Sequence, residues 1–125
     1  MGIYLICFGD SEKNLAIAIK EKVIGVNHNT TFDAKANAYL TVKRENNWTV
    51  VARANVKGRI DKNPFPKPNN YRTYEIVNLK KCSPYAISDV LKSEMGKLYG
   101  LALRTPRLIT AQNLVSQIEE RFCSL

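Results

Sequence analysis

The hydrophobic pattern at the start of the chain predicts a buried strand followed by an amphipathic helix. Residues 3–8 are all apolar, which is typical of a strand that is buried on both faces and is therefore central in its sheet. Polar residues end this run, and Ser11 is the type of residue that caps a helix, which we expect to continue to Lys22. The apolar stripe of this helix consists of Leu15, Ile19 and Val23. We expect the stripe to pack on the sheet.

The next part of the chain has the pattern of an antiparallel hairpin. Residues 39–43 and 48–54 are rich in Thr, Val, Trp and Tyr, which favour strands. Between them, residues 45–47 (Glu-Asn-Asn) tolerate the left-handed geometry of a tight turn. The polar residues 27–37 come before the hairpin, and we expect them to form a surface loop that Phe32 anchors.

A proline-rich segment, residues 58–70, interrupts the strand pattern. Its prolines cannot donate to the hydrogen bonds of a sheet, so we expect a loop rather than a strand or a domain boundary. Phe65 lies between two of these prolines and is therefore presented rigidly. Two interpretations of this ring have equal weight: a lid over a pocket, or a plug in the core.

The last part of the chain predicts alternating strands and helices. Residues 71–79 read as a strand, and Ser83 followed by Pro84 is typical of a helix start, with the helix ending near residue 92. Residues 98–103 read as a last strand, and residues 108–122 as a closing helix. The pattern predicts an α+β fold, in which a curved mixed sheet or small β-barrel is flanked by helices.

Length and charge add a domain count and a class of partner. The chain has 125 residues, which predicts one domain over residues 1–125. Its 19 Lys and Arg outnumber its 11 Asp and Glu, and the formal net charge is +8. A basic excess of this size favours a polyanionic partner such as nucleic acid, and the other interpretation is that it serves solubility.

The sequence carries no sign of catalysis, a metal or a cofactor. Cys7, Cys82, Cys123 and the single His28 have no metal-ligand spacing, and Cys7 has the position of a small core residue. No nucleophile and base are paired, so we predict a non-enzyme without a cofactor. The start has no signal-peptide pattern and no long apolar stretch occurs, so we expect a cytoplasmic protein that does not bind membranes.

Three groups of basic residues are candidates for phosphate contacts. Arg104 and Arg107 flank a turn before the last helix, an arrangement that suits bidentate contacts to phosphate. The second group lies in or beside the proline-rich segment and consists of Lys57, Arg59, Lys62 and Lys67. The third group, Lys80 with Lys81, follows the predicted strand 71–79. The alternative for these groups is a solvated surface.

Several segments together resemble a known group of domains. Residues 4–7 (Tyr-Leu-Ile-Cys), 14–18 (Asn-Leu-Ala-Ile-Ala) and 23–26 (Val-Ile-Gly-Val) resemble the opening of EVE and YTH domains. Residues 40–48 and 50–54 resemble the hairpin of these domains. The chain is thus similar to the PUA-like superfamily. The resemblance implies a pocket that accepts a flipped, often methylated, base between aromatic side chains.

The resemblance also implies which residues line this pocket. Asp10 and Asn14 stand where YTH domains hold the polar groups that read the edge of the base, while Asn27 and His28 stand at the pocket rim. The implied pocket consists of Asp10, Asn14, Ile24, Gly25, Asn27, His28 and Phe65.

The sequence departs from the family pattern at Ile24. Many members have a tryptophan of the aromatic cage at this position, and Gly25 lies beside it. Stacking on an aromatic ring contributes about 1 to 3 kcal/mol per base. A ring from another part of the chain, namely Phe65, Tyr71 or Trp48, would have to replace it.

The first functional hypothesis is a non-catalytic module that binds DNA or RNA, methylated or not. PUA-like members also occur as DNA-reading modules of Mcr-type modification-dependent restriction GTPases, which implies further domains or subunits of a restriction complex as partners. The chain itself has no phosphate loop of the GTPase type. The alternative is a protein-interaction or regulatory module with a basic surface. A small hydrolase or transferase ranks below both.

Overall fold

The protein is built on a mixed sheet with helices on both sides. The structure is a computed structural model that describes residues 2–96, 103 and 106–124. The five strands lie in the order β1-β3-β4-β5-β2, with β1 parallel to β3 and the other neighbours antiparallel. The strands are β1 Ile3–Cys7, β2 Val23–Val26, β3 Asn37–Arg44, β4 Asn47–Ile60 and β5 Arg72–Ala86. The described helices are α1 Glu12–Glu21, α2 Ser88–Met95 and α4 Gln112–Arg121. This confirms the predicted α+β class.

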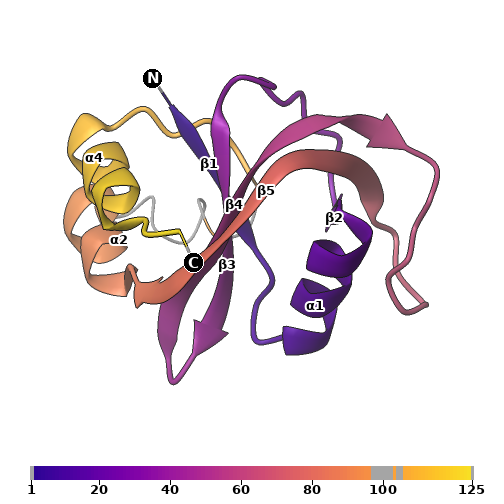
Figure 1. Cartoon of the computed structure of the whole chain (residues 1–125), viewed down its shortest axis with the longest axis horizontal. Helices are drawn as coiled ribbons and strands as arrows, with labels where there is room; N and C mark the ends of the chain where they lie inside the picture. The colour runs from indigo at the N-terminus through magenta and orange to yellow at the C-terminus, as the bar shows by residue number, and fades with distance from the viewer. Residues whose placement is uncertain (1, 97–102, 104–105, 125) are drawn as a thin grey trace.

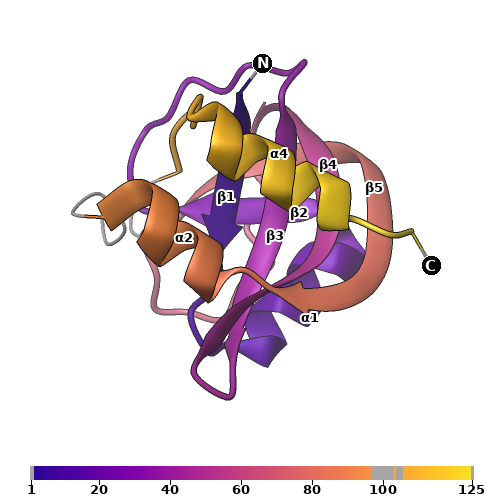
Figure 2. The ribbon, with the colours of Figure 1, turned by 90° about the vertical axis from the view of Figure 1, so that its left-hand side faces the viewer.

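Two core clusters lie on the two faces of the sheet. Figure 1 shows α2 and α4 together on one side and α1 on the other, and Figure 2 shows α2 and α4 lying across β1 and β3. Leu15 of α1 belongs to one cluster, and Leu91 and Leu114 of α2 and α4 belong to the other. Both faces of the sheet are therefore covered, which makes β1 apolar at every position.

The position of β1 corrects a prediction. We expected a central strand, but β1 lies at one edge of the sheet, with β2 at the other edge. The burial of its side chains comes from the helices and the core on its two faces. Whether a strand is central or at an edge depends on backbone hydrogen bonds in the plane of the sheet. The polarity of its side chains carries no information on these bonds.

The first helix begins where the sequence predicted. The hydroxyl of Ser11 accepts a hydrogen bond from the backbone N–H of Asn14 at 3.1 Å, which is an N-cap. The helix ends at Glu21, and Lys22 takes a left-handed conformation with φ of 55°. Because this turn redirects the chain, Val23 begins β2 instead of extending the helical stripe.

The hairpin and the loops around it also agree with the pattern. Glu45 and Asn46 have positive φ values of 50° and 64° in the turn between β3 and β4. Phe32 anchors the preceding loop, because its ring packs edge-on against Tyr4 and Tyr74 with centroid distances of 5.0 and 4.9 Å. β4 continues to Ile60, so the proline-rich loop begins later than predicted.

The predicted helix start at Ser83 and Pro84 is wrong. These residues belong to β5, and α2 begins at Ser88. Lys81 pairs with Ala52 and Tyr85 pairs with Val50, so an irregularity in the strand pairing falls between them. Pro84 is tolerated there because a bulge leaves a residue without a ladder partner.

The predictions for the last part of the chain are met in part. Of the expected strand 98–103, residues 98–102 lie outside the described residues, and Leu103 has helical backbone. The closing helix begins at Gln112 rather than residue 108, because Ile109 pairs with Ile3 in an antiparallel bridge. In the described ranges, no helix has both the length and the apolar character needed to cross a bilayer.

The packing of α4 generates a stability prediction. Leu114 is fully buried between α4 and the sheet, so Leu114→Ala should lower the free energy of unfolding by about 2 to 5 kcal/mol through lost burial and a new cavity. Urea denaturation would measure the change. Ser116→Ala, on the exposed side of the same helix, is the control and should change stability little. Equal stability of both variants would contradict this packing.

Candidate functional site

A pocket lies where the two edge strands of the curled sheet approach each other. Its walls come from Leu5, Ile6 and Cys7 of β1, from Gly25 and Val26 of β2, and from Asn27, His28, Tyr71, Leu103 and Pro106. A second hollow of about 240 Å³ shares Cys7, Gly25 and Tyr71 with it and adds Phe8, Gly9, Asn14 and Phe65. We call the two adjoining hollows the seam pocket.

The backbone of the edge strands contributes polar groups to the seam pocket. β1 pairs with β3 on one side, and β2 pairs with β5. Apart from the bridge between Ile3 and Ile109, the opposite sides of both strands have no strand partner within residues 2–96, 103 and 106–124. Unpaired strand edges present alternating N–H and C=O groups. The seam pocket can therefore offer hydrogen bonds to a planar ligand from its backbone.

One aromatic ring, that of Tyr71, lies against the backbone of β2. A Cβ atom added to Gly25 would lie 2.8 Å from Cδ2 of Tyr71, which is closer than side chains approach. Gly25 is therefore required for this contact, since any larger residue would displace the ring. Phe65 packs edge-on against Tyr71 with a centroid distance of 5.6 Å. Tyr71 is partly exposed and lines both hollows.

Of the two roles that the sequence left open for Phe65, the structure shows the plug in the core. Its side chain is 3% exposed and belongs to a small cluster with Ala18 and Val23, so it plugs the core beneath α1. The same ring forms part of the wall of the seam pocket. Its neighbour Tyr71 therefore rests on a buried support rather than on solvent.

Asn69 organises the proline-rich loop that carries both rings. Its amide donates to the carbonyl of Pro66 at 2.8 Å, and its Oδ1 accepts from the Asn63 amide at 2.8 Å and from the backbone N–H of Tyr71 at 3.1 Å. These bonds tie the loop to the start of β5. They fix the position from which Tyr71 enters the seam pocket.

The polar residues predicted for the pocket lie partly at the seam. Asn14, Asn27 and His28 line it, as do Gly25 and Phe65. Within the described part of the chain, the side-chain amide of Asn14 has no hydrogen-bond partner. The carbonyl of Asn27 accepts a hydrogen bond from Arg72 at 2.9 Å, which ties the residue after β2 to β5. Asn14 is thus available to a ligand as both donor and acceptor.

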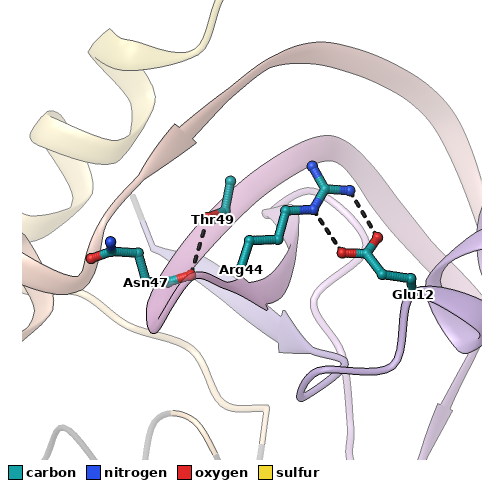
Figure 3. Close-up of polar contacts among 4 residues, drawn as sticks. All are labelled: Glu12, Arg44, Asn47 and Thr49. Atoms are coloured by element: carbon teal, nitrogen blue, oxygen red, sulfur yellow. Dashed lines mark hydrogen bonds and ion pairs between the residues drawn. The ribbon is translucent and has the colours of Figure 1, made fainter.

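The other two predicted pocket residues lie elsewhere. Ile24 is fully buried in the core beside Tyr74 and lines neither hollow of the seam pocket. Asp10 lines a separate open hollow, where Figure 3 shows Glu12 accepting two hydrogen bonds from Arg44, at 2.7 and 2.9 Å. Arg44 holds the pKa of Glu12 below its usual value through this bidentate pair. The pair joins the hairpin to the start of α1.

The predicted phosphate contacts are scattered over the surface. Lys57 and Lys67 are exposed, whereas Lys62 pairs with Glu21. Arg59 donates to the side chain of Asn29 at 3.1 Å, and its guanidinium lies 5.5 Å from the centre of the Tyr74 ring.

Two of the predicted cations lie on segments that also contribute residues to the seam pocket. Lys67 belongs to the loop that carries Phe65, and Arg107 is exposed and directly follows Pro106, which lines the seam pocket. Arg104 lies outside the described residues. Basic residues therefore occur on two of the segments that contribute residues to the seam pocket.

Cys7 lines the seam pocket but lacks the properties of a nucleophile. Burial raises its pKa to about 11, and a hydrogen bond from Thr41 at 3.1 Å opposes the shift only in part. An activated cysteine has a lowered pKa instead. In residues 2–96, 103 and 106–124 no three His, Cys, Asp or Glu side chains gather as a metal site.

The sequence did not identify Arg72, Leu103 or Pro106 as residues of this region. Arg72 was an ordinary residue of a predicted strand, and its contact with Asn27 depends on the pairing of β2 with β5. Leu103 and Pro106 come from a segment far along the chain. No local pattern indicates such contacts, because they join segments that are distant in the sequence.

Comparison with known proteins identifies the fold. The crystal structure of the MmI1 YTH domain superposes with a TM-score of 0.64 and 19% sequence identity, over 96% of this chain and 96% of that chain. No protein-family model and no curated protein matches the sequence. The protein therefore has a YTH-like, PUA-like fold, as its sequence resemblance implied.

The environment of Cys7 generates a prediction on thiol reactivity. With its pKa raised to about 11, only about one Cys7 thiol in a thousand is ionised at pH 8. Cys123 is exposed and should react first with a thiol reagent, while Cys7 and Cys82 should react slowly until the protein unfolds. The rate for Cys7 should rise about tenfold per pH unit up to about pH 11.

The measurement is a spectroscopic thiol titration of the native protein. Cys123→Ser should remove the fast phase and leave the slow one. A fast phase that survives in this variant would show that a thiol of the core or the seam is more reactive than its burial allows.

Proposed function

We propose that the protein is a non-catalytic nucleic-acid-binding module that takes an extruded base into the seam pocket. The observation that carries this proposal is the ring of Tyr71, which contacts Gly25 of β2 and lines the seam pocket together with residues of β1 and β2. A flat aromatic surface beside unpaired backbone groups matches the two needs of a base, stacking and hydrogen bonding along one edge.

Tyr71 supplies the ring that the sequence lacks at Ile24. Ile24 is in the core, so the aromatic surface of the pocket comes from the loop before β5 instead of from β2. Stacking of a base on one ring contributes about 1 to 3 kcal/mol. Asn14 adds an amide that can both donate to and accept from the base edge.

The charge of the protein supports a polyanionic ligand. A formal net charge of +8 attracts nucleic acid at long range, and Lys67 and Arg107 lie on segments beside the seam. A methylated base as ligand, and a targeting role in an Mcr-type restriction complex, stay predictions from the sequence resemblance. The high pKa of Cys7 supports binding without catalysis.

The proposal predicts that the ring of Tyr71 is needed for base recognition. Tyr71→Ala should weaken binding of the preferred oligonucleotide by about 1 to 3 kcal/mol, because the stacking surface is lost. Tyr71→Phe keeps the ring and should bind like the unchanged protein. Fluorescence polarisation with matched DNA and RNA oligonucleotides, with and without methylated adenine or cytosine, measures both variants.

The outcomes separate three explanations. Equal weakening of all oligonucleotides by Tyr71→Ala would mean that the ring stacks on any base and does not select one base over another. Unchanged binding in this variant, with its fold verified by thermal melting, would remove the seam pocket from nucleic-acid binding. Absence of binding to every oligonucleotide at physiological salt would favour the protein-interaction module.

The two predicted polar readers can be told apart by their positions. Asn14 lines the seam pocket and Asp10 lines the hollow beside Glu12 and Arg44. Asn14→Ala should therefore reduce the discrimination between bases about tenfold, as for the loss of one hydrogen bond in a pocket. Asp10→Asn should leave discrimination nearly unchanged. A larger effect of Asp10→Asn in the same titration would place the base in the other hollow.

A further inference from the structure

Another hollow lies on β4 and β5. It has a volume of about 350 Å³, and its polar lining consists of Asn37, Arg53, Asn55, Asn78 and Lys80. None of the residues that line it is acidic. We call it the β4–β5 hollow. Its lining residues share no member with those of the seam pocket.

Two cations lie directly opposite each other in this hollow. Arg53 of β4 and Lys80 of β5 are register partners, and like charges at such positions repel. In the described part of the chain, the ion pairs are Arg44 with Glu12 and Lys62 with Glu21, so neither Arg53 nor Lys80 has a carboxylate partner there. The repulsion is uncompensated by the described residues. An anion between the two side chains would turn it into attraction.

The guanidinium of Arg53 is held in place by stacking. Its Cζ lies 4.1 Å from the centre of the Phe122 ring, directly after α4. Phe122 is in turn packed edge-on against Tyr39, the partner of Arg53 on β3. A stacked guanidinium keeps its N–H donors in the plane of the group, where they can reach an anion in a bidentate manner. Arg53 is therefore oriented before any ligand binds.

Neutral amides complete the wall of the β4–β5 hollow. Asn78 donates to Oδ1 of Asn55 at 3.0 Å, and Asn55 donates to the carbonyl of Ala36 at 3.1 Å. Asn78 has a left-handed backbone with φ of 57°, which turns it out of the regular strand geometry. This chain of hydrogen bonds fixes two amides beside two cations. Such a donor-rich wall fits an oxyanion.

We propose that the β4–β5 hollow binds a phosphate group of the nucleic-acid backbone. The inference rests on the proposed function, since it assumes that the ligand is a nucleic acid. Arg53 offers a planar pair of donors, Lys80 a point charge, and the amides further hydrogen bonds. Contacts of this kind add affinity and fix the path of the strand, but they do not read sequence.

The test measures the salt dependence of binding. Arg53→Gln/Lys80→Gln should weaken binding about tenfold and equally for modified and unmodified oligonucleotides, and it should lower the slope of log K against log salt by about one. Lys43→Gln/Lys92→Gln removes the same charge from exposed positions outside this hollow and is the matched control. Lys80→Gln alone avoids any loss of Arg53 packing, and should reproduce part of the effect.

A further variant separates shape from charge. Arg53→Lys keeps the charge but loses the planar pair of donors, so its affinity should lie between those of the unchanged protein and Arg53→Gln. Equal affinity and salt slope in the double variant and its control would overturn the inference. A stronger effect on an acidic protein partner than on any oligonucleotide would also overturn it.

Failure of this inference can be distinguished from failure of the proposed function. If Tyr71→Ala loses base discrimination while the Arg53 and Lys80 variants match the control, only the β4–β5 hollow is excluded. If the Arg53 and Lys80 variants weaken binding while Tyr71→Ala keeps discrimination, the phosphate site stands and the seam pocket is excluded. If the unchanged protein binds no oligonucleotide, both are wrong.

Discussion

The structure depends on the separation of two strands that are neighbours in sequence. β1 and β2 are joined only by the α1 segment, yet they form the opposite edges of the sheet. The long strands β4 and β5 bend the sheet, with register irregularities at three places along their pairing. The bend brings the two edges to the walls of one pocket without pairing them. A pocket between two backbone edges is thus a consequence of strand order.

The proline-rich loop supplies the aromatic rings of the seam pocket. Without it, the seam pocket would lack the rings of Tyr71 and Phe65. The hydrogen bonds of Asn69 direct the loop, Phe65 supports it from the core, and Gly25 leaves the space that Tyr71 occupies. Each residue is ordinary by itself. The combination puts a supported ring against a strand edge, which is a geometry suited to a flat ligand.

The sequence predicted the local elements and missed what depends on pairing. The cap at Ser11 and the turn at Glu45 and Asn46 were correct because short-range backbone chemistry determines them. The edge position of β1 and the strand that runs through Pro84 were missed, because hydrogen bonding between distant segments determines both. The same distinction between local and long-range determinants applies to the candidate site. The resemblance led to Asn14, Asn27 and His28 at the seam, but the contact between Tyr71 and Gly25 depends on the register of β2 and β5.

The distribution of charge connects the two proposed sites. The pocket that would read a base is lined by amides, the phenol of Tyr71, Cys7, His28 and backbone groups, whereas Arg53 and Lys80, which have no carboxylate partner among the described residues, lie on β4 and β5. Separation of this kind has a physical advantage. A cation inside a base pocket would attract any phosphate and would favour every sequence equally. A cation outside the base pocket adds affinity without reducing the discrimination between bases. A nucleic-acid strand that contacts both sites would be held by charge at the β4–β5 hollow and selected by the shape of its base at the seam pocket.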